Sequence, residues 1–113
     1  MKPMLKKRLL DALEACRAIQ GFVTGRAFTD YERNLMLRSA VERQFEIIGE
    51  ALNLAEVEEP ELSGSIPDLR RIVGMRNRII HGYDSVDDQL LWQVVQTHLP
   101  TLANQLEQLL DSD

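Results

Sequence analysis

The sequence feature that most constrains the fold is a row of apolar residues that recurs every three or four positions in the second quarter of the chain. This spacing follows the 3.6-residue period of an α-helix. The sequence therefore predicts one long amphipathic helix from about Asp30 to Glu56. The row consists of Leu37, Val41, Phe45, Ile48, Leu52 and Ala55.

Three further segments carry the same period. The first extends from about Pro3 to Phe22, and the third begins near Ile66 behind a capping arrangement and ends at His81 and Gly82. The fourth follows a cap at Ser85 or Asp87 and continues to about Leu110, and Pro100 should kink or split it. The apolar faces are Leu5, Leu9, Ala12, Leu13, Cys16 and Ile19 in the first, Leu69, Val73, Ile80 and Tyr83 in the third, and Leu91, Val95, Leu99, Leu102, Leu106 and Leu109 in the fourth.

Composition agrees with helices. The chain has 113 residues, 44% of them hydrophobic and only 5% aromatic, and β-branched runs are scarce. This size fits one domain spanning residues 1–113 with a modest core. We therefore predict an all-α fold.

The charge of the chain is acidic, with 18 acidic and 13 basic residues and a net charge of −5. A negative surface argues against broad nucleic-acid binding, which requires basic groups to displace phosphate counterions. The arginines are nevertheless concentrated, because Arg70, Arg71, Arg76 and Arg78 lie within nine positions. The charges alone leave two interpretations open, a local positive strip and an ordinary solvated helix face.

Cysteine usage and hydropathy leave the cytoplasm as the expected default compartment. The single Cys16 excludes an intrachain disulfide, and no cluster of cysteine and histidine has the spacing of zinc ligands. No apolar run approaches ~18 residues, and the first residues lead directly into an amphipathic helix. We expect neither a membrane segment nor a metal site.

Chemically versatile side chains gather at the end of the third predicted helix. Arg76, His81 and Tyr83 lie within eight residues. Arg76 falls on the apolar stripe of this helix, so it needs a buried partner or it meets another chain. Gly74 in the helix interior costs about 1 kcal/mol relative to alanine, which suggests that a neighbour packs closely there.

The long helix offers carboxylates that could serve Arg76. Glu42, Glu46 and Glu50 form a polar row at four-residue steps, with Gly49 beside them as a second place for close approach. Such a row is more often a solvated face. The alternative is that one of these carboxylates pairs with Arg76, since a buried arginine requires a partner. His98 lies without polar company in the sequence and is expected to be structural.

Arg76, His81 and Tyr83 resemble the R-x4-H-x-Y motif of HEPN-domain ribonuclease toxins of the HepT type. The likeness extends over about residues 30–103 and includes Phe45–Ala51, Ile66-Pro67, Trp92 and Leu99-Pro100. One departure is Asp84, which adds a negative charge beside Tyr83. The resemblance implies a small antiparallel bundle of four to five helices that forms homodimers, with the motifs of both chains facing one cleft.

The chemistry of metal-free RNA cleavage fits these residue types. It needs a base for the 2′-hydroxyl, a positive charge for the phosphorane and an acid for the leaving 5′-oxygen. Imidazole titrates near neutral pH and guanidinium is always charged. One chain supplies only one such pair, and a two-fold dimer supplies two. We expect Arg76 and His81 to be catalytic without a cofactor, and Asn77, one turn before His81, to orient its ring.

The resemblance further implies a type VII toxin–antitoxin system. The antitoxin of such a pair is a minimal nucleotidyltransferase, which uses ATP and magnesium to transfer AMP to the motif tyrosine, here Tyr83. Tyr83 is also placed to contact RNA. Two alternatives remain, a non-catalytic helical subunit that binds substrate or nucleotide for a nucleotidyltransferase, and a plain oligomerisation module.

Overall fold

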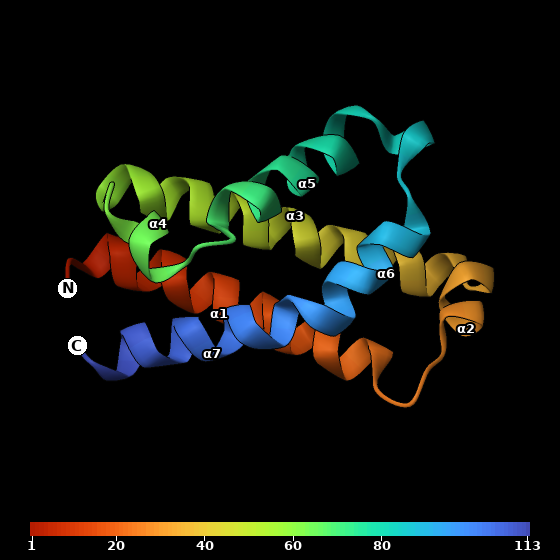
Figure 1. The fold of residues 1–113 in the computed structure, drawn as a ribbon, viewed down its shortest axis with the longest axis horizontal. Coiled ribbons are helices and arrows are strands. Elements are labelled where there is room, and N and C mark those ends of the chain that lie inside the picture. The colour runs from red at the N-terminus through yellow and green to blue at the C-terminus, as the bar shows by residue number, and fades with distance from the viewer.

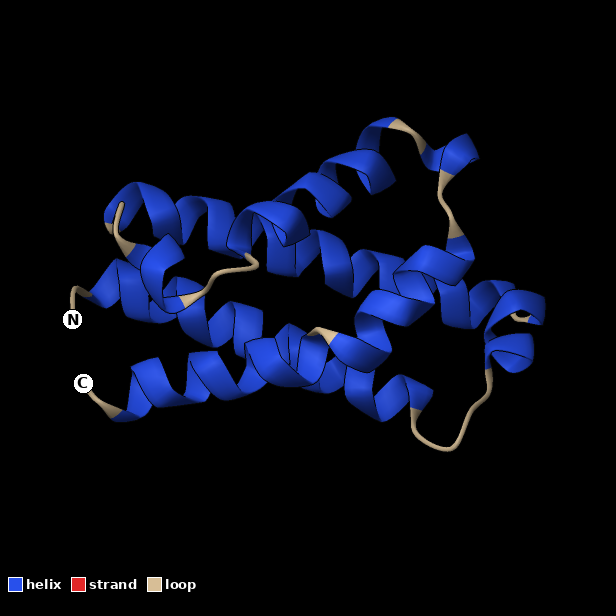
Figure 2. Cartoon of the chain, viewed as in Figure 1, coloured by secondary structure: helices blue, strands red, loops and turns tan.

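The computed structural model describes the backbone of residues 1–113 and every side chain except that of Tyr83. Every regular element in it is helical (Figure 2). The elements are α1 (Pro3–Val23), α2 (Phe28–Arg33), α3 (Leu35–Glu58), α4 (Leu62–Ser65), α5 (Leu69–His81), the 3-10 turn η1 (Tyr83–Ser85), α6 (Asp88–Thr97) and α7 (Leu99–Asp111). The prediction of an all-α fold is confirmed.

Helix α3 is the centre of the bundle, because α1 and α5 both pack along it (Figure 1). Helix α7 packs on the far side of α1, and α6 leads into α7. Successive long helices run in opposite directions, so the bundle is antiparallel. This order leaves one face of α3 between α1 and α5.

The core contains most of the apolar stripes that the sequence predicts. Every predicted core residue of α1 and α3 is buried. In α5, Leu69 and Val73 are buried, but Ile80 is 39% exposed and Ile72 and Ile79 are in the core instead. Ile80 lies with Arg76 along the open cleft between α5 and α3 rather than in the core, so the predicted stripe was wrong at this end.

Two predicted helix boundaries were also wrong. The long helix is interrupted at Asn34, whose Oδ1 accepts a hydrogen bond of 3.0 Å from Leu37 N and so begins α3 as a new helix. The third helix begins at Leu69 rather than near Ile66. Ile66 precedes a proline and has φ −127° and ψ 84°, and a residue before proline is disfavoured in the helical region.

The prediction for the last helix is confirmed. Asp87 accepts a hydrogen bond of 3.0 Å from Leu90 N at the start of α6. Pro100 lies in the first turn of α7 and separates it from α6. Among the helices described here, none combines the length and the apolar character needed to cross a membrane.

Candidate functional site

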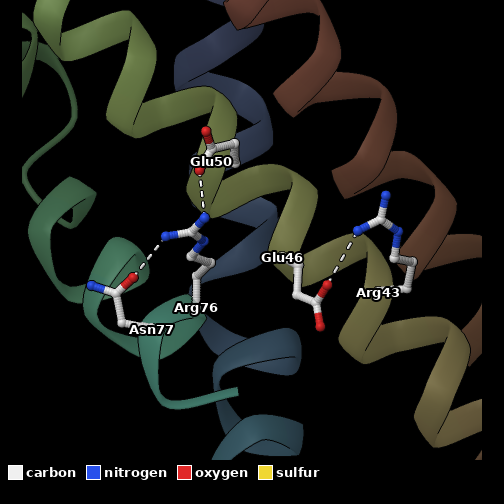
Figure 3. Close-up of polar contacts among 5 residues, drawn as sticks. All are labelled: Arg43, Glu46, Glu50, Arg76 and Asn77. Atoms are coloured by element: carbon white, nitrogen blue, oxygen red, sulfur yellow. Dashed lines mark hydrogen bonds and ion pairs between the residues drawn. The ribbon is translucent and has the colours of Figure 1, made fainter. Parts of the chain in front are cut away.

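Arg76 is the most firmly held of the motif residues. Its Nη2 lies 2.5 Å from Glu50 Oε2 of α3, and its Nη1 donates a 2.8 Å hydrogen bond to Asn77 Oδ1. Figure 3 shows the guanidinium between these two acceptors. The side chain is 22% exposed, so this is a partly buried ion pair. The row of glutamates was expected to be either a solvated face or a source of a partner for Arg76. The second interpretation is confirmed for Glu50.

The backbone of α3 is shaped to receive Arg76. A Cβ placed on Gly49 would lie 2.2 Å from Arg76 Cβ and 2.5 Å from Arg76 Cγ, closer than real side chains pack. The expected close approach thus occurs at Gly49, which is buried. It does not occur within the chain at Gly74, where nothing lies within 4 Å of an added Cβ.

The bonds to Glu50 and Asn77 leave part of the guanidinium available. Each terminal nitrogen carries two hydrogens and is bound to one acceptor, so one N–H remains on each. The Nε atom is buried and has no hydrogen-bond partner among the described atoms. A buried donor of this kind costs about 1–3 kcal/mol when it is left unpaired. Arg76 is thus fixed in place with donors to spare, which suits binding of phosphate oxygens.

Arg76 opens onto a cleft of about 210 Å³ on the face of α3 that lies between α1 and α5. We call this the Arg76 cleft. Its walls mix charged groups with the apolar side chains of Ile47, Leu54 and Ile80. The first two are half-buried and Ile80 is exposed. Arg43 and Glu46 form an ion pair of 3.2 Å on its floor (Figure 3).

His81 is the last residue of α5 and is exposed. Asn77 was expected to orient its ring, and the Asn77 carboxamide instead accepts from Arg76. Gly82 ends the helix as predicted, and a Cβ there would lie 2.9 Å from Ser85 Oγ. The turn η1 begins at Tyr83, but the Tyr83 side chain lies outside the described residues and its role remains a prediction.

Arg76 and His81 do not face the same side of α5. An α-helix turns about 100° per residue, so side chains five positions apart project roughly 140° apart. His81 is accordingly not among the residues that line the Arg76 cleft. A single chain therefore holds the two groups on different sides of one helix.

The arginine strip predicted from the sequence divides in the same way. Arg70 pairs with Glu56 and Arg76 with Glu50, both toward α3. Arg71 and Arg78 are exposed on the other side. Within the described part of the chain, the other two arginines of the strip form no ion pair.

His98 was expected to be a structural or surface histidine without polar company, but the structure gives its ring two polar partners. Its Nδ1 lies 3.1 Å from Asp68 Oδ2 and its Nε2 lies 3.4 Å from Arg71 Nη1. The ring thus lies between a carboxylate and a guanidinium. His98 thereby ties the start of α5 to the junction of α6 and α7.

The sequence did not reveal which groups surround Arg76. Arg8 and Asp11 of α1 reach the Arg76 cleft from more than sixty positions away, together with Arg43 of α3. Helical periodicity predicts which face of a helix is apolar but not which helices become neighbours. Only the pairing of Glu50 with Arg76 was indicated by the sequence, in which the small residue Gly49 stands next to the carboxylate.

Comparison with known proteins identifies the family. The family model "Ribonuclease HepT-like" matches residues 12–109. A "Probable ribonuclease HepT" of Thermococcus cleftensis is 35% identical over 109 residues, which cover 96% of this chain and 98% of the relative. "Putative RNase MJ1380" of Methanocaldococcus jannaschii is 33% identical over 103 residues, covering 91% and 94%. No solved structure gives a significant match. The chain therefore belongs to the HepT-like ribonuclease family.

Proposed function

We propose that this protein is a metal-independent endoribonuclease that acts as a homodimer, with Arg76 and His81 as its catalytic residues. The observation that carries the proposal is the way Arg76 is held. Gly49, Glu50 and Asn77 fix the guanidinium and leave N–H donors available in an open cleft. A merely structural ion pair would not require a glycine beneath it.

The reaction follows from these groups. One His81 takes the proton of the ribose 2′-hydroxyl, and the 2′-oxygen attacks the adjacent phosphorus. The bond from phosphorus to the 5′-oxygen breaks, and this oxygen takes a proton from a second imidazole. Arg76 binds the phosphoryl oxygens and stabilises the charge of the phosphorane. The products are a 2′,3′-cyclic phosphate and a 5′-hydroxyl, and the two imidazoles together have moved one proton.

Two chains are needed because one chain supplies a single motif histidine, and that histidine projects away from its own Arg76. A two-fold contact that sets the His81 end of the partner's α5 against the Arg76 cleft would bring a second Arg76 and a second His81 to one phosphate. The exposed Ile80 and the half-buried Ile47 and Leu54 provide apolar surface for this contact. The sequence suggested a dimer interface that includes the Gly74–Tyr83 face of α5. Because Arg71 and Arg78 are exposed on the Gly74 side, we propose that the interface lies on the Arg76 side instead.

The direct test is cleavage of bulk cellular RNA by the purified protein in EDTA. We expect cleavage by the unaltered chain and its loss in Arg76→Ala and in His81→Ala. Arg17→Ala is the matched control, because Arg17 is an exposed arginine of α1 away from the Arg76 cleft. Circular dichroism and sedimentation would verify that each variant remains a helical dimer. Full activity in both motif variants would contradict the proposal.

We further propose that the protein is the toxin of a type VII toxin–antitoxin pair. Its partner would be a minimal nucleotidyltransferase that inactivates it by adenylylating Tyr83. The phenol oxygen of Tyr83 would lose its proton and attack the α-phosphorus of ATP. The bond from this phosphorus to the β-phosphate would break, and pyrophosphate would leave with magnesium bound. Tyr83 is only two residues after His81, so the added phosphate brings negative charge and bulk to the RNA site. Cleavage itself needs no cofactor in this scheme.

A further inference from the structure

A second binding surface lies along the opposite side of α5 from the Arg76 cleft. It is a groove of about 540 Å³ between α5 and α6. Arg71, Gly74 and Arg78 line it from α5, and Leu90, Gln93 and His98 line it from the following segment. We call it the Arg71 groove.

The groove presents a row of positive charge that ends at His81. Arg71, Gly74, Arg78 and His81 lie at steps of three and four residues, so they fall within roughly 80° of one another around the helix. Arg71 and Arg78 are about 10.5 Å apart along the axis, and His81 is about 4.5 Å further on. Any ligand that follows this row is therefore led to the proposed proton-transfer residue.

The charges in this row are not satisfied by carboxylates. Within the described part of the chain, neither Arg71 nor Arg78 forms an ion pair, whereas Arg70, which also lines the groove, pairs with Glu56, and Arg76 pairs with Glu50. The one polar contact of Arg71 is with the ring of His98, which holds it toward the groove. The chain carries a net charge of −5. Two arginines that line one groove without an ion pair to a described carboxylate therefore indicate an anionic ligand.

Gly74 keeps the floor of the groove low between the two arginines. It is exposed, and nothing lies within 4 Å of a Cβ built on it. Met75 and Leu90 add apolar surface beside the arginines, and Gln93 adds an amide. The combination of two cations, a low floor and an apolar wall suits a phosphodiester backbone with its ribose rings.

We infer that the Arg71 groove binds the phosphodiester backbone of single-stranded RNA and guides it to His81. This inference rests on the proposed function, since it assigns the path of the same substrate. A single strand is favoured because a duplex holds each 2′-oxygen away from in-line attack on its neighbouring phosphorus. No Phe, Tyr or Trp is among the lining residues of the groove, and the His98 ring is held by Asp68 and Arg71, so we expect backbone binding with little base preference.

A second copy of the chain fits this surface less well. A two-fold contact would place the groove against itself, and Arg71 and Arg78 would face the same residues of the partner. Like charges in such a contact oppose association. RNA carries the opposite charge and meets no such penalty.

The test measures binding of a fluorescent 2′-O-methyl oligoribonucleotide in EDTA, because this probe cannot be cleaved through its 2′-oxygen. Arg71→Ala/Arg78→Ala should weaken binding at least tenfold at low salt. It should also reduce the slope of log affinity against log salt by about 1.4, the value for two phosphate contacts on a single strand. The matched control, Arg17→Ala/Arg26→Ala, removes the same charge from α1 and the following turn and should leave binding unchanged.

A second variant addresses the risk that the double variant alters the fold. Gly74→Glu adds a carboxylate between the arginines where there is open space, and Gly74→Gln adds the same bulk without charge. The glutamate variant should bind the probe much more weakly than the glutamine variant. Equal binding of the probe by all of these variants and the unaltered chain would overturn the inference.

The outcomes separate the groove from the proposed function. Cleavage that depends on Arg76 and His81, together with unchanged probe binding in the groove variants, would reject the groove alone. Groove-dependent binding without any cleavage of natural RNA would reject the proposed function alone. If the groove variants lose only the complex with the nucleotidyltransferase, the groove is a protein-binding surface and the RNA inference is wrong.

Discussion

Gly49 of α3 lies directly beneath the stem of Arg76 of α5, so close that a Cβ on Gly49 would be 2.2 Å from the Cβ of Arg76. This contact lets the guanidinium pass α3 and reach Glu50. Because Arg76 Cβ is fixed to its backbone, the two helices themselves must separate if residue 49 has a side chain. The position of the proposed catalytic arginine therefore depends on the absence of one methyl group.

We expect Gly49→Ala to destabilise the protein by about 1–3 kcal/mol through this overpacking. The matched substitution Gly74→Ala adds the same methyl group to an open position of α5 and should stabilise by about 1 kcal/mol. Thermal unfolding of the two variants should shift the Tm in opposite directions. RNA cleavage should fall in Gly49→Ala even well below its Tm. Equal Tm shifts would show that the contact is not tight in solution.

Glu50 is a positioning residue in this account, since it holds Arg76 without contacting RNA. The pair is partly exposed, so Glu50→Ala should cost less than about 1 kcal/mol of stability. The kcat of the Glu50→Ala variant for RNA cleavage should nevertheless fall roughly ten- to hundredfold, because the Arg76 guanidinium is no longer fixed. Glu50→Gln retains an acceptor oxygen and should recover part of the loss. Unchanged kcat in Glu50→Ala would show that Asn77 and Gly49 suffice to position Arg76.

Tyr83 should be the acceptor of AMP when the protein is incubated with its nucleotidyltransferase, ATP and magnesium. Intact mass should increase by one or more AMP groups, and Tyr83→Phe should abolish the increase. Tyr31 is a built-in control, because it is fully buried against Trp92, with ring centroids 5.2 Å apart. Its hydroxyl cannot reach another enzyme unless the bundle opens. A mass increase that persists in Tyr83→Phe would exclude this mode of regulation.

The stability of the bundle should respond to pH through Glu42. Burial raises the pKa of the Glu42 carboxyl, and the charges of Asp88 and Glu46 raise this pKa further against the opposing effect of Arg38. A folded-state pKa above the unfolded value means that the ionised group disfavours folding at neutral pH. This penalty decreases as the pH falls through the folded pKa, and it disappears below the unfolded one.

Glu42→Gln should therefore raise the Tm at neutral pH, and its advantage should shrink in the acid range. The exposed Glu14 of α1 gives the matched control, and Glu14→Gln should change the Tm little at any pH. A Glu42→Gln advantage that stays constant between neutral and acid pH would show that charge is not its cause.

The sequence predicted the elements of this fold better than their junctions. The apolar rows of α1 and α3 were sufficient to predict these helices and their buried faces, because helical periodicity is a local property. The interruption at Asn34 was missed, since it depends on one side chain capping Leu37 N rather than on the apolar pattern. The start of α5 was misplaced because the restriction that Pro67 imposes on Ile66 outweighs the capping arrangement expected near Ile66.

The candidate site was predictable only in part for a similar reason. The motif identified Arg76 and His81, and the row of glutamates contained the partner Glu50. Neither the motif nor the row of glutamates showed that Arg76 and Arg71 face opposite sides of α5. Gly74 attracted attention as a helix glycine, yet the close approach is at Gly49, because only the packing of α5 on α3 decides which glycine has a neighbour.

In the proposed mechanism, His81 and Arg76 cleave RNA through its own 2′-oxygen. The most direct measurement is the end chemistry of RNA fragments made by the purified protein in EDTA, read by mass spectrometry. We predict 2′,3′-cyclic phosphate and 5′-hydroxyl ends, no cleavage of a 2′-O-methyl substrate, and no such fragments from His81→Ala. Fragments with 3′-hydroxyl and 5′-phosphate ends, or the same cyclic ends from His81→Ala, would contradict the account.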